Sequence, residues 1–440
     1  MSIPARVDRI DWSRRRRQLV NLRQRSRDVV VGAAVVGSAT GLVVAGFDRA
    51  VVDGVLNKVL DAPVWLAAFL PALGLIVAAV VLRVVGRDGA SGTADEYLHA
   101  FHNPHVELSV RSLVARLMAA VCTLGAGVPM GLEGPSLFAG ASIGALTQRR
   151  LRRLFGHADT RTLMVAGAAA GVAAIFKAPA TGVVFALEVP YVDDLARRML
   201  LPALVAASSG YLVFVAINGT APLFAVSGDP QFVFVDLAGA VALGLLCGIG
   251  ARLFAKLVRR AKSLVHVSPW RRVPAAGAVL AGLFALTRVL TGQNLALSSG
   301  YNVIAWAAQP NRGLWLLLAI LVIRCVATAT AVSGGGVGGL FIPLAVAGTL
   351  VGRIVGAVIP SADEGLFTVL GTAAFLGAGY RVPLAAVMFV AETTGRPGFV
   401  VPGLLAAVSA ELMMGSMSVT TYQRDLIAPP FGTDLGPTVG

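Results

Sequence analysis

Charged residues are scarce in this chain of 440 residues. They make up 14% of it, whereas 56% of its residues are hydrophobic; an average soluble protein is about one quarter charged. Acids are scarcer than bases, since 23 Asp and Glu residues stand against 37 Lys and Arg residues. So low a charge content argues against an ordinary soluble domain and points toward a membrane protein.

Cysteine is nearly absent as well. Cys122, Cys247 and Cys325 all lie inside apolar runs, and no two of them have the CxxC spacing. We therefore interpret the three thiols as small core residues, with no disulfide framework and no thiolate metal site. We expect neither a metal nor a cofactor.

Long apolar runs dominate the chain instead. Runs long enough to cross a bilayer include 29–46, 64–82, 233–254 and 314–332. Similar runs fill most of the sequence, which predicts an all-α polytopic membrane protein. Because 50 glycines and 22 prolines interrupt these runs, we expect tilted and broken helices whose open backbone is buried in protein or lines a watery cavity.

The net charge of +14 comes from basic clusters that flank the apolar runs. Arg14–Arg17, Arg149–Arg150 and Arg259–Arg260 are examples. Short basic loops mark the cytoplasmic side of a bilayer. We therefore place the N-terminus in the cytoplasm and the protein in a plasma membrane of the bacterial, inner-membrane type, with membrane lipid and no nucleic acid among its partners.

The chain also contains an internal repeat. Residues 167–188 align without gaps to residues 371–392, at an offset of 204 residues, with eight identities. The tetrads FKAP (176–179) and YRVP (380–383) fall in phase. A duplicated transport fold places its substrate near the membrane midplane, between broken helices of the two halves.

The repeat suggests five segments. A basic cytoplasmic segment (1–28) precedes the first transmembrane repeat (29–220), and a linker (221–231) leads to the second transmembrane repeat (232–425). The tail (426–440) is short and rich in Pro and Gly. We expect no CBS domains in it.

Three glycine-rich stretches open predicted helices: 89–98 with Ser91, 131–140 with Pro135 at a first helical position, and 333–344. The free N–H groups and partial positive charge of a helix start bind an anion without help from a basic side chain. Weak binding of this kind suits an ion that must pass through.

Glu133 stands among glycines and apolar residues in the second of these stretches, where burial of a charge is costly. Its carboxylate is itself an anion and can occupy a dipole-lined site when no ion is there. Once protonated, it loses that attraction and swings away. One residue would then act as both gate and proton carrier; the alternative is a surface-facing carboxylate at a helix start.

These motifs resemble the CLC family of chloride channels and chloride/proton exchangers, also called voltage-gated chloride channels. The resemblance extends from about residue 29 to 425 and rests on GLEGP (131–135), the segment 176–188, GGLFIP (338–343) and an isolated tyrosine in SVTTYQ (418–423). It implies a CLC-type fold of two inverted-topology repeats and a homodimer with one pore in each subunit.

The resemblance also implies the roles of individual residues. Glu133 is the gating and proton-transfer glutamate, the backbone amides of Leu340 and Phe341 bind chloride, and Ser91 and Tyr422 supply two hydroxyl donors to the ion. Position alone would make Ser91 a helix cap and Tyr422 an interfacial tyrosine. The loops of the ion pathway contribute six further residues: Gly92, Gly131, Gly134, Pro135, Gly338 and Gly339.

Proton-coupled chloride exchange is the leading hypothesis for the function. The family's usual GSGIP is ASGTA here (90–94), which retains the serine and favours chloride but leaves the anion preference open. Exchangers carry an internal proton glutamate after the position of Glu188, where this chain has Val189. Val189 supports the alternative, a passive chloride channel. We find no nucleophile–base pair for an intramembrane hydrolase and expect no enzymatic activity.

Two further pairs occupy equivalent repeat positions. We expect structural hydrogen bonds from Glu188 and Glu392, because their repeated placement indicates a role in the fold. Lys177 and Arg381 either attract anions near a pore mouth or extend toward the membrane interface.

Overall fold

The structure is a computed structural model. It describes residues 12–87, 90–150, 161–192, 194–221, 234–309, 312–359 and 365–425, and the side chains of those between residues 27 and 424. Most of the predicted linker, the tail and part of the basic N-terminal segment lie outside these residues.

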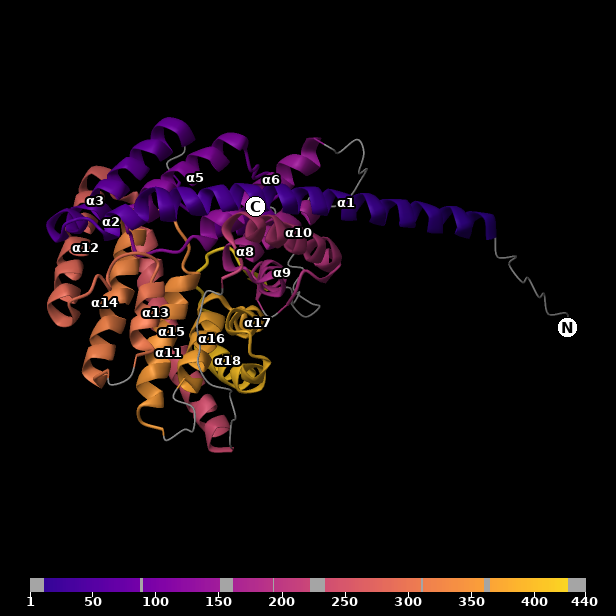
Figure 1. The fold of residues 1–440 in the computed structure, drawn as a ribbon. Coiled ribbons are helices and arrows are strands. Elements are labelled where there is room, and N and C mark those ends of the chain that lie inside the picture. The colour runs from indigo at the N-terminus through magenta and orange to yellow at the C-terminus, as the bar shows by residue number, and fades with distance from the viewer. Residues whose placement is uncertain are drawn as a thin grey trace, which may run out of the picture.

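Helices form nearly all of the described chain, as predicted (Figure 1). The first half contains α1 (Trp12–Val51), α2 (Asn57–Leu60), α3 (Val64–Val81), α4 (Ala94–His102), α5 (Val110–Gly125), α6 (Glu133–Arg150), α8 (Thr162–Phe176), α9 (Pro179–Glu188) and α10 (Leu200–Asn218). The second half contains α11 (Phe234–Ser263), α12 (Pro269–Thr291), α13 (Tyr301–Ala307), α14 (Leu314–Ser333), α15 (Phe341–Gly356), α16 (Leu366–Tyr380), α17 (Pro383–Thr394) and α18 (Val400–Met414).

Strands are minor among the described residues. β1 (Tyr191–Val192) pairs in parallel with β2 (Arg424–Asp425), which ties the end of the chain to the first half. Seven helical stretches in the described part are long and apolar enough to cross a membrane. Shorter apolar helices, such as α8, α9, α15 and α17, are largely buried. The protein is therefore an integral membrane protein of many helices, several of them broken.

The two halves repeat the same helix packing. In the first half α6 packs on α8, and α10 packs on both α1 and α8. In the second half α15 packs on α16, and α18 packs on both α11 and α16. The equivalent helices α8 and α16 begin 204 residues apart, the offset seen in the sequence. The described helices therefore show the duplication in three dimensions.

Glycines allow the closest of these packings. A Cβ added to Gly140 of α6 would lie 1.9 Å from the carbonyl oxygen of Gly167 in α8, and one added to Gly348 of α15 would lie 2.1 Å from that of Gly371 in α16. Small residues let helix backbones approach closely inside membranes. Two pairs at equivalent positions explain why glycine recurs in both halves.

Two helix starts differ from the sequence prediction. α4 begins at Ala94, with Thr93 as the residue before it, so Ser91 lies in the preceding loop and does not cap the helix. α6 begins at Glu133, which makes Pro135 its third residue and not its first. The third start is as expected, because α15 begins at Phe341 directly after the glycine loop.

Candidate functional site

Glu133 and Phe341 begin two helices from opposite halves of the chain, α6 and α15. The Phe341 N–H donates to Oε1 of Glu133 at 2.7 Å, and the glutamate side of the pair is only 3% exposed. An anionic group at a helix N-terminus is stabilised by the free N–H groups and the helix dipole. Its burial excludes the surface-facing carboxylate that was the alternative from sequence.

Two backbone hydrogen bonds hold the loops before these helices together. The Gly131 N–H donates to the Gly339 carbonyl at 2.9 Å, and the Gly339 N–H donates to the Gly131 carbonyl at 2.7 Å. This isolated antiparallel bridge connects residues that are far apart in sequence. It fixes the loop of Glu133 against the loop that precedes Phe341.

Side-chain atoms added at these glycines would overlap the carboxylate or its neighbours. A Cβ at Gly131 would lie 1.9 Å from Oε2 of Glu133, and one at Gly339 would lie 2.1 Å from Oε1. At Gly134, an added Cβ would lie 2.5 Å from the Thr93 hydroxyl. The glycines therefore allow the backbone to approach the carboxylate closely.

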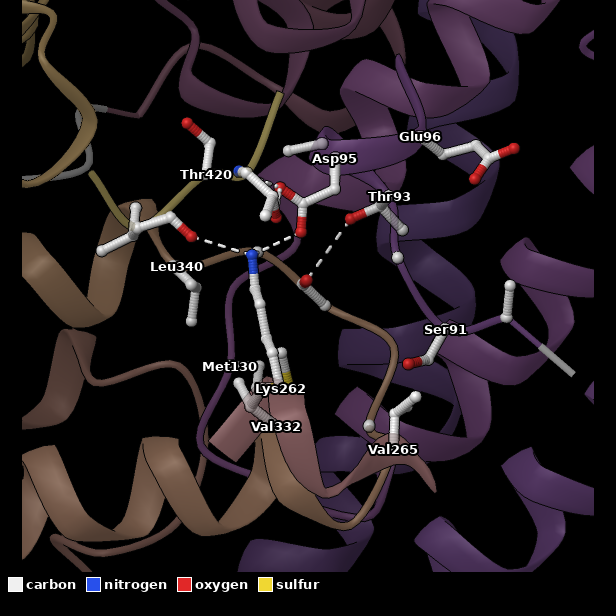
Figure 2. A pocket seen from close by; sticks show the side chains of 18 of the residues that line it. Ser91, Thr93, Asp95, Glu96, Met130, Lys262, Val265, Val332, Leu340 and Thr420 are labelled. Carbon is white, nitrogen blue, oxygen red and sulfur yellow. Dashed lines mark hydrogen bonds and ion pairs between the residues drawn. The ribbon is translucent and has the colours of Figure 1, made fainter. Parts of the chain in front are cut away.

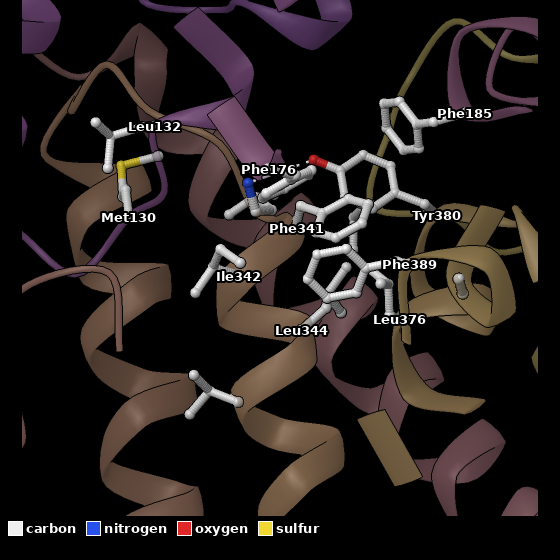
Figure 3. Close-up of a cluster of buried hydrophobic side chains, with 14 of the residues drawn as sticks. Met130, Leu132, Phe176, Phe185, Phe341, Ile342, Leu344, Leu376, Tyr380 and Phe389 are labelled. Atoms are coloured by element: carbon white, nitrogen blue, oxygen red, sulfur yellow. Dashed lines mark hydrogen bonds between the residues drawn. The ribbon is translucent and has the colours of Figure 1, made fainter. Parts of the chain in front are cut away.

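The amide next to Phe341 is also engaged by a side chain. The Leu340 N–H donates to the hydroxyl oxygen of Tyr380 at 3.3 Å, and Tyr380 is buried. The Tyr380 ring belongs to a cluster of aromatic side chains around Phe341, which includes Phe185 and Phe389 (Figure 3). Both amides predicted to bind an anion thus donate to oxygens of the protein itself.

A cleft of about 900 Å³ reaches this site and is lined by residues of both halves (Figure 2). Ser91 and Thr93 line it from the first half, and Leu340, Tyr380 and Tyr422 from the second. Basic side chains also line it: Arg83, Arg87, Lys262, His266 and Arg272. Asp95 and Glu96 line the cleft as well, so four Lys and Arg residues stand against two acids. A concave surface with net positive charge raises the local concentration of anions.

Asp95 and Lys262 form an ion pair inside this cleft. Asp95 also accepts the Thr421 N–H at 3.0 Å, and Lys262 donates to the Val419 carbonyl at 2.8 Å. These bonds tie α4, α11 and the segment after α18 to one another. They hold the loops of Ser91 and Tyr422 on the same side of the cleft.

The structure thus brings Glu133, Leu340 and Phe341 together with the glycines at 131, 134, 338 and 339. Ser91 and Gly92 line the cleft beside them. Tyr422 lines the same cleft, but it is 43% exposed and stacks on His99, with ring centroids 4.5 Å apart. The buried phenol that reaches the amide of Leu340 is Tyr380.

Glu188 and Glu392 make the structural hydrogen bonds predicted for them. Glu188 accepts the N–H groups of Leu384 at 3.1 Å and Ala385 at 2.9 Å, at the start of α17. Glu392 accepts those of Ala180 at 2.9 Å and Thr181 at 2.6 Å, at the start of α9. Each carboxylate therefore caps a helix of the other half.

Lys177 and Arg381 separate paired helices, and neither lines the cleft. Both have left-handed backbone angles, with φ of 53° and 58°, at the breaks between α8 and α9 and between α16 and α17. Lys177 donates to the Ala221 carbonyl at 3.0 Å, and Arg381 pairs with Glu411 at 2.8 Å. The two residues occupy equivalent positions because each one forms the left-handed turn between two helices.

Three polar residues were not found by reasoning from the sequence, two of them buried (Tyr380 and Asp236) and one partly buried (Asp48). Tyr380 was noted only as part of the repeated tetrad, although Phe176 at the equivalent position lacks its hydroxyl. Asp48 lies within α1 and accepts from the Asn218 amide at 2.8 Å. Asp236 is fully buried in the first turn of α11. The difference between Phe176 and Tyr380 at the same position of the two in-phase tetrads was the available signal for Tyr380.

Residues 73–415 match the sequence profile of the family described as voltage gated chloride channel. The chain belongs to this family, the CLC family. The match covers most of the chain and includes every site residue predicted from the sequence except Tyr422. Both repeats are therefore part of one family fold.

Relatives of known function are similar over nearly the whole chain. The H(+)/Cl(-) exchange transporter ClcA of Salmonella paratyphi B is 29% identical over 425 residues, covering 91% of this chain and 89% of that protein. ClcA of Citrobacter koseri is 29% identical over 422 residues, covering 91% and 88%.

Solved structures confirm the fold. A slow cyanobacterial Cl−/H+ antiporter superposes with a TM-score of 0.77 at 22% identity, over 88% of this chain and 94% of that one. A CLC-type fluoride/proton antiporter gives a TM-score of 0.75 at 21% identity, over 91% and 98%. The expected CLC-type architecture is thus confirmed, whereas these likenesses leave the transported ion to be argued from the site.

Proposed function

We propose that this protein exchanges chloride for protons across a membrane, with Glu133 as the gate and the proton carrier. The observation that supports this most directly is the hydrogen bond from the Phe341 amide to the buried Glu133 carboxylate. A site that holds a carboxylate oxygen through backbone N–H groups suits a halide for the same electrostatic reason. The names of the ClcA relatives agree with this substrate pair.

In this mechanism the carboxylate and the anion compete for the same helix start. While Glu133 is ionised, its carboxylate accepts the hydrogen bond of the Phe341 amide. An anion that reaches Leu340 and Phe341 must therefore displace the carboxylate. Protonation removes the negative charge, weakens the attraction to the α15 dipole and lets the side chain leave. Chloride then enters as the protonated side chain moves away, which couples the two ions in opposite directions.

The neutral character of the site suits transport. The ligands proposed for chloride are the amides of Leu340 and Phe341 and the hydroxyls of Ser91 and Tyr422, and none of them carries a full charge. Binding that is favourable enough for entry and weak enough for exit is the condition for passage. Replacing Tyr422 with alanine should loosen chloride binding, which isothermal titration measures directly.

The cleft opens to the cytoplasm in this proposal. Its lining carries Arg83, Arg87, Lys262 and Arg272, and basic residues beside apolar spans mark the cytoplasmic side of a membrane. The N-terminus lies on that side, in a bacterial-type inner membrane. We further propose a homodimer in which each subunit has its own pathway.

A passive chloride channel is the second candidate, and Val189 favours it. Val189 is buried, and its carbonyl accepts from the Gln423 side chain at 3.0 Å, so the position offers no titratable group for a proton. Purified protein in liposomes separates the two functions. A chloride gradient should drive protons uphill if the protein is an exchanger; chloride flow with no proton movement would establish the channel instead.

A further inference from the structure

Tyr380 places a phenol oxygen on an amide beside the gate. The Leu340 N–H donates to its Oη at 3.3 Å, and the next amide, that of Phe341, donates to Glu133 at 2.7 Å. The first bond is longer than the ~2.9 Å of a typical N–H···O bond. It is therefore the weaker of the two and the easier to displace.

The internal repeat shows that the fold needs only the ring at this position. Phe176 is the equivalent residue in the first half, and it packs against Phe341 with ring centroids 4.5 Å apart. Tyr380 packs in the same aromatic cluster, 5.5 Å from Phe185 (Figure 3). Burying a hydroxyl costs free energy unless it is hydrogen-bonded, so its presence in one half only calls for a separate reason.

A second buried tyrosine provides a contrast. The hydroxyl of Tyr97 donates to the Ala186 carbonyl at 3.3 Å, a bond that uses its proton within the protein. The Tyr380 hydroxyl acts as an acceptor, and no acceptor for its own proton occurs among the described residues. Tyr380 also lines the cleft, together with Leu340. A buried O–H group that can still donate a hydrogen bond thus lies at the end of the cleft through which the anion would arrive.

We propose that the Tyr380 hydroxyl is a direct ligand of the transported anion. When it binds, the anion accepts one hydrogen bond from the Leu340 N–H and another from the Tyr380 O–H. The phenol thus changes from acceptor to donor without moving its ring. This inference rests on the proposed function only in taking chloride as the anion. It adds a hydroxyl ligand that the family resemblance did not provide.

Removing this hydroxyl has two opposing effects on chloride affinity, and the larger effect decides whether binding weakens or tightens. Tyr380→Phe frees the Leu340 amide from a competing acceptor, which favours the anion. It also removes a donor to a full negative charge. Hydrogen bonds to ions are roughly twice as strong as neutral ones, and the bond lost by the amide is long. Losing the Tyr380 donor therefore outweighs freeing the Leu340 amide, and chloride binding should weaken roughly tenfold.

The test is isothermal titration of the purified full chain with chloride and, separately, with thiocyanate. Tyr380→Phe should weaken chloride binding about tenfold and thiocyanate binding less, because a large, diffuse anion gains less from one donor. Tyr97→Phe is the matched control and should leave both affinities unchanged. Equal or tighter chloride binding by Tyr380→Phe would overturn the inference, as would equal losses for the two anions.

A second variant covers the case in which Tyr380→Phe fails to fold. Tyrosine fluorinated on its ring at position 380 keeps the shape and makes the O–H a stronger donor, so chloride should bind several-fold more tightly; unchanged or weaker binding would contradict the inference. Proton flux is read in the same preparations. If the wild-type protein moves chloride without protons, the exchange proposal fails while the titrations still decide the role of Tyr380.

Discussion

Glu188 and Glu392 cap each other's half of the molecule. Glu188 ends α9 and binds the first amides of α17, while Glu392 lies in α17 and binds the first amides of α9. Each carboxylate thus reaches across the boundary between the repeats and binds the start of a helix in the other one. This reciprocal capping holds the broken helices α9 and α17 side by side without relying on any group of the ion pathway.

Glu392→Gln should lower the thermal stability of the purified protein. The carboxylate serves three donors, since Oε1 accepts from Ala180, and Oε2 accepts from both the N–H and the hydroxyl of Thr181. The amide would turn an NH2 group toward one of these donors, at a cost of about 1–3 kcal/mol for each buried group left unpaired. Thermal unfolding in detergent measures the loss.

The matched control is Glu107→Gln. Glu107 pairs with Arg149, but its side chain is 74% exposed, and such a pair contributes about 1 kcal/mol at most. If both variants melt together with the wild-type protein, the capping role of Glu392 is wrong.

Gly131→Ala should expel the Glu133 carboxylate from its site. The new Cβ would lie 1.9 Å from Oε2, where no shift of a few tenths of an ångström relieves the overlap. We expect the variant to conduct chloride with proton coupling reduced severalfold, as measured by paired chloride and proton fluxes from liposomes. Gly282→Ala is the control, because its Cβ meets nothing within 4 Å. Full coupling in Gly131→Ala would contradict the packing described.

Arg324→Lys should destabilise the loop before α13. The buried guanidinium donates to the carbonyls of Leu295, Leu297, Ser298 and Ser299. A lysine ammonium cannot reproduce this planar fork, so we expect a loss of about 2 kcal/mol or more from carbonyls left unpaired. Arg197→Lys, at a side chain that is 82% exposed, should change stability little; a similar loss in both would refute the role of the fork.

The Asp95–Lys262 pair should show a modest coupling energy. Both side chains are partly exposed, at 20% and 27%, so solvent weakens their attraction and a value of about 1 kcal/mol is expected. A double-mutant cycle of Asp95→Asn and Lys262→Met on thermal stability measures it. Strictly additive losses would show that the pair does not hold the cleft together.

The sequence was sufficient for the parts of the site made of backbone. GLEGP and GGLFIP name the residues whose amides and glycines must meet, and the repeat with its fixed offset predicted both the duplication and the structural role of Glu188 and Glu392. The roles of these amides followed from the resemblance to the CLC family, and glycine spacing predicted the start of α15 correctly but not the starts of α4 and α6.

The positions of individual hydroxyl groups could not be predicted from the sequence. Tyr380 reaches Leu340 only because α16 ends against the start of α15, and Tyr422 points its exposed ring at His99 because the segment after α18 is held by Asp95. Both are consequences of packing between distant segments. Phe176 beside Tyr380 in the repeat alignment was the one local hint.

Proton movement by Glu133→Gln tests the central claim most directly. The variant keeps the size of the side chain but cannot be ionised. In liposomes with an outward chloride gradient, the wild-type protein should drive protons uphill, while the variant should pass chloride and move no protons. Coupled proton movement that persists in Glu133→Gln at the wild-type ratio would contradict the claim that this one carboxylate is both gate and proton carrier.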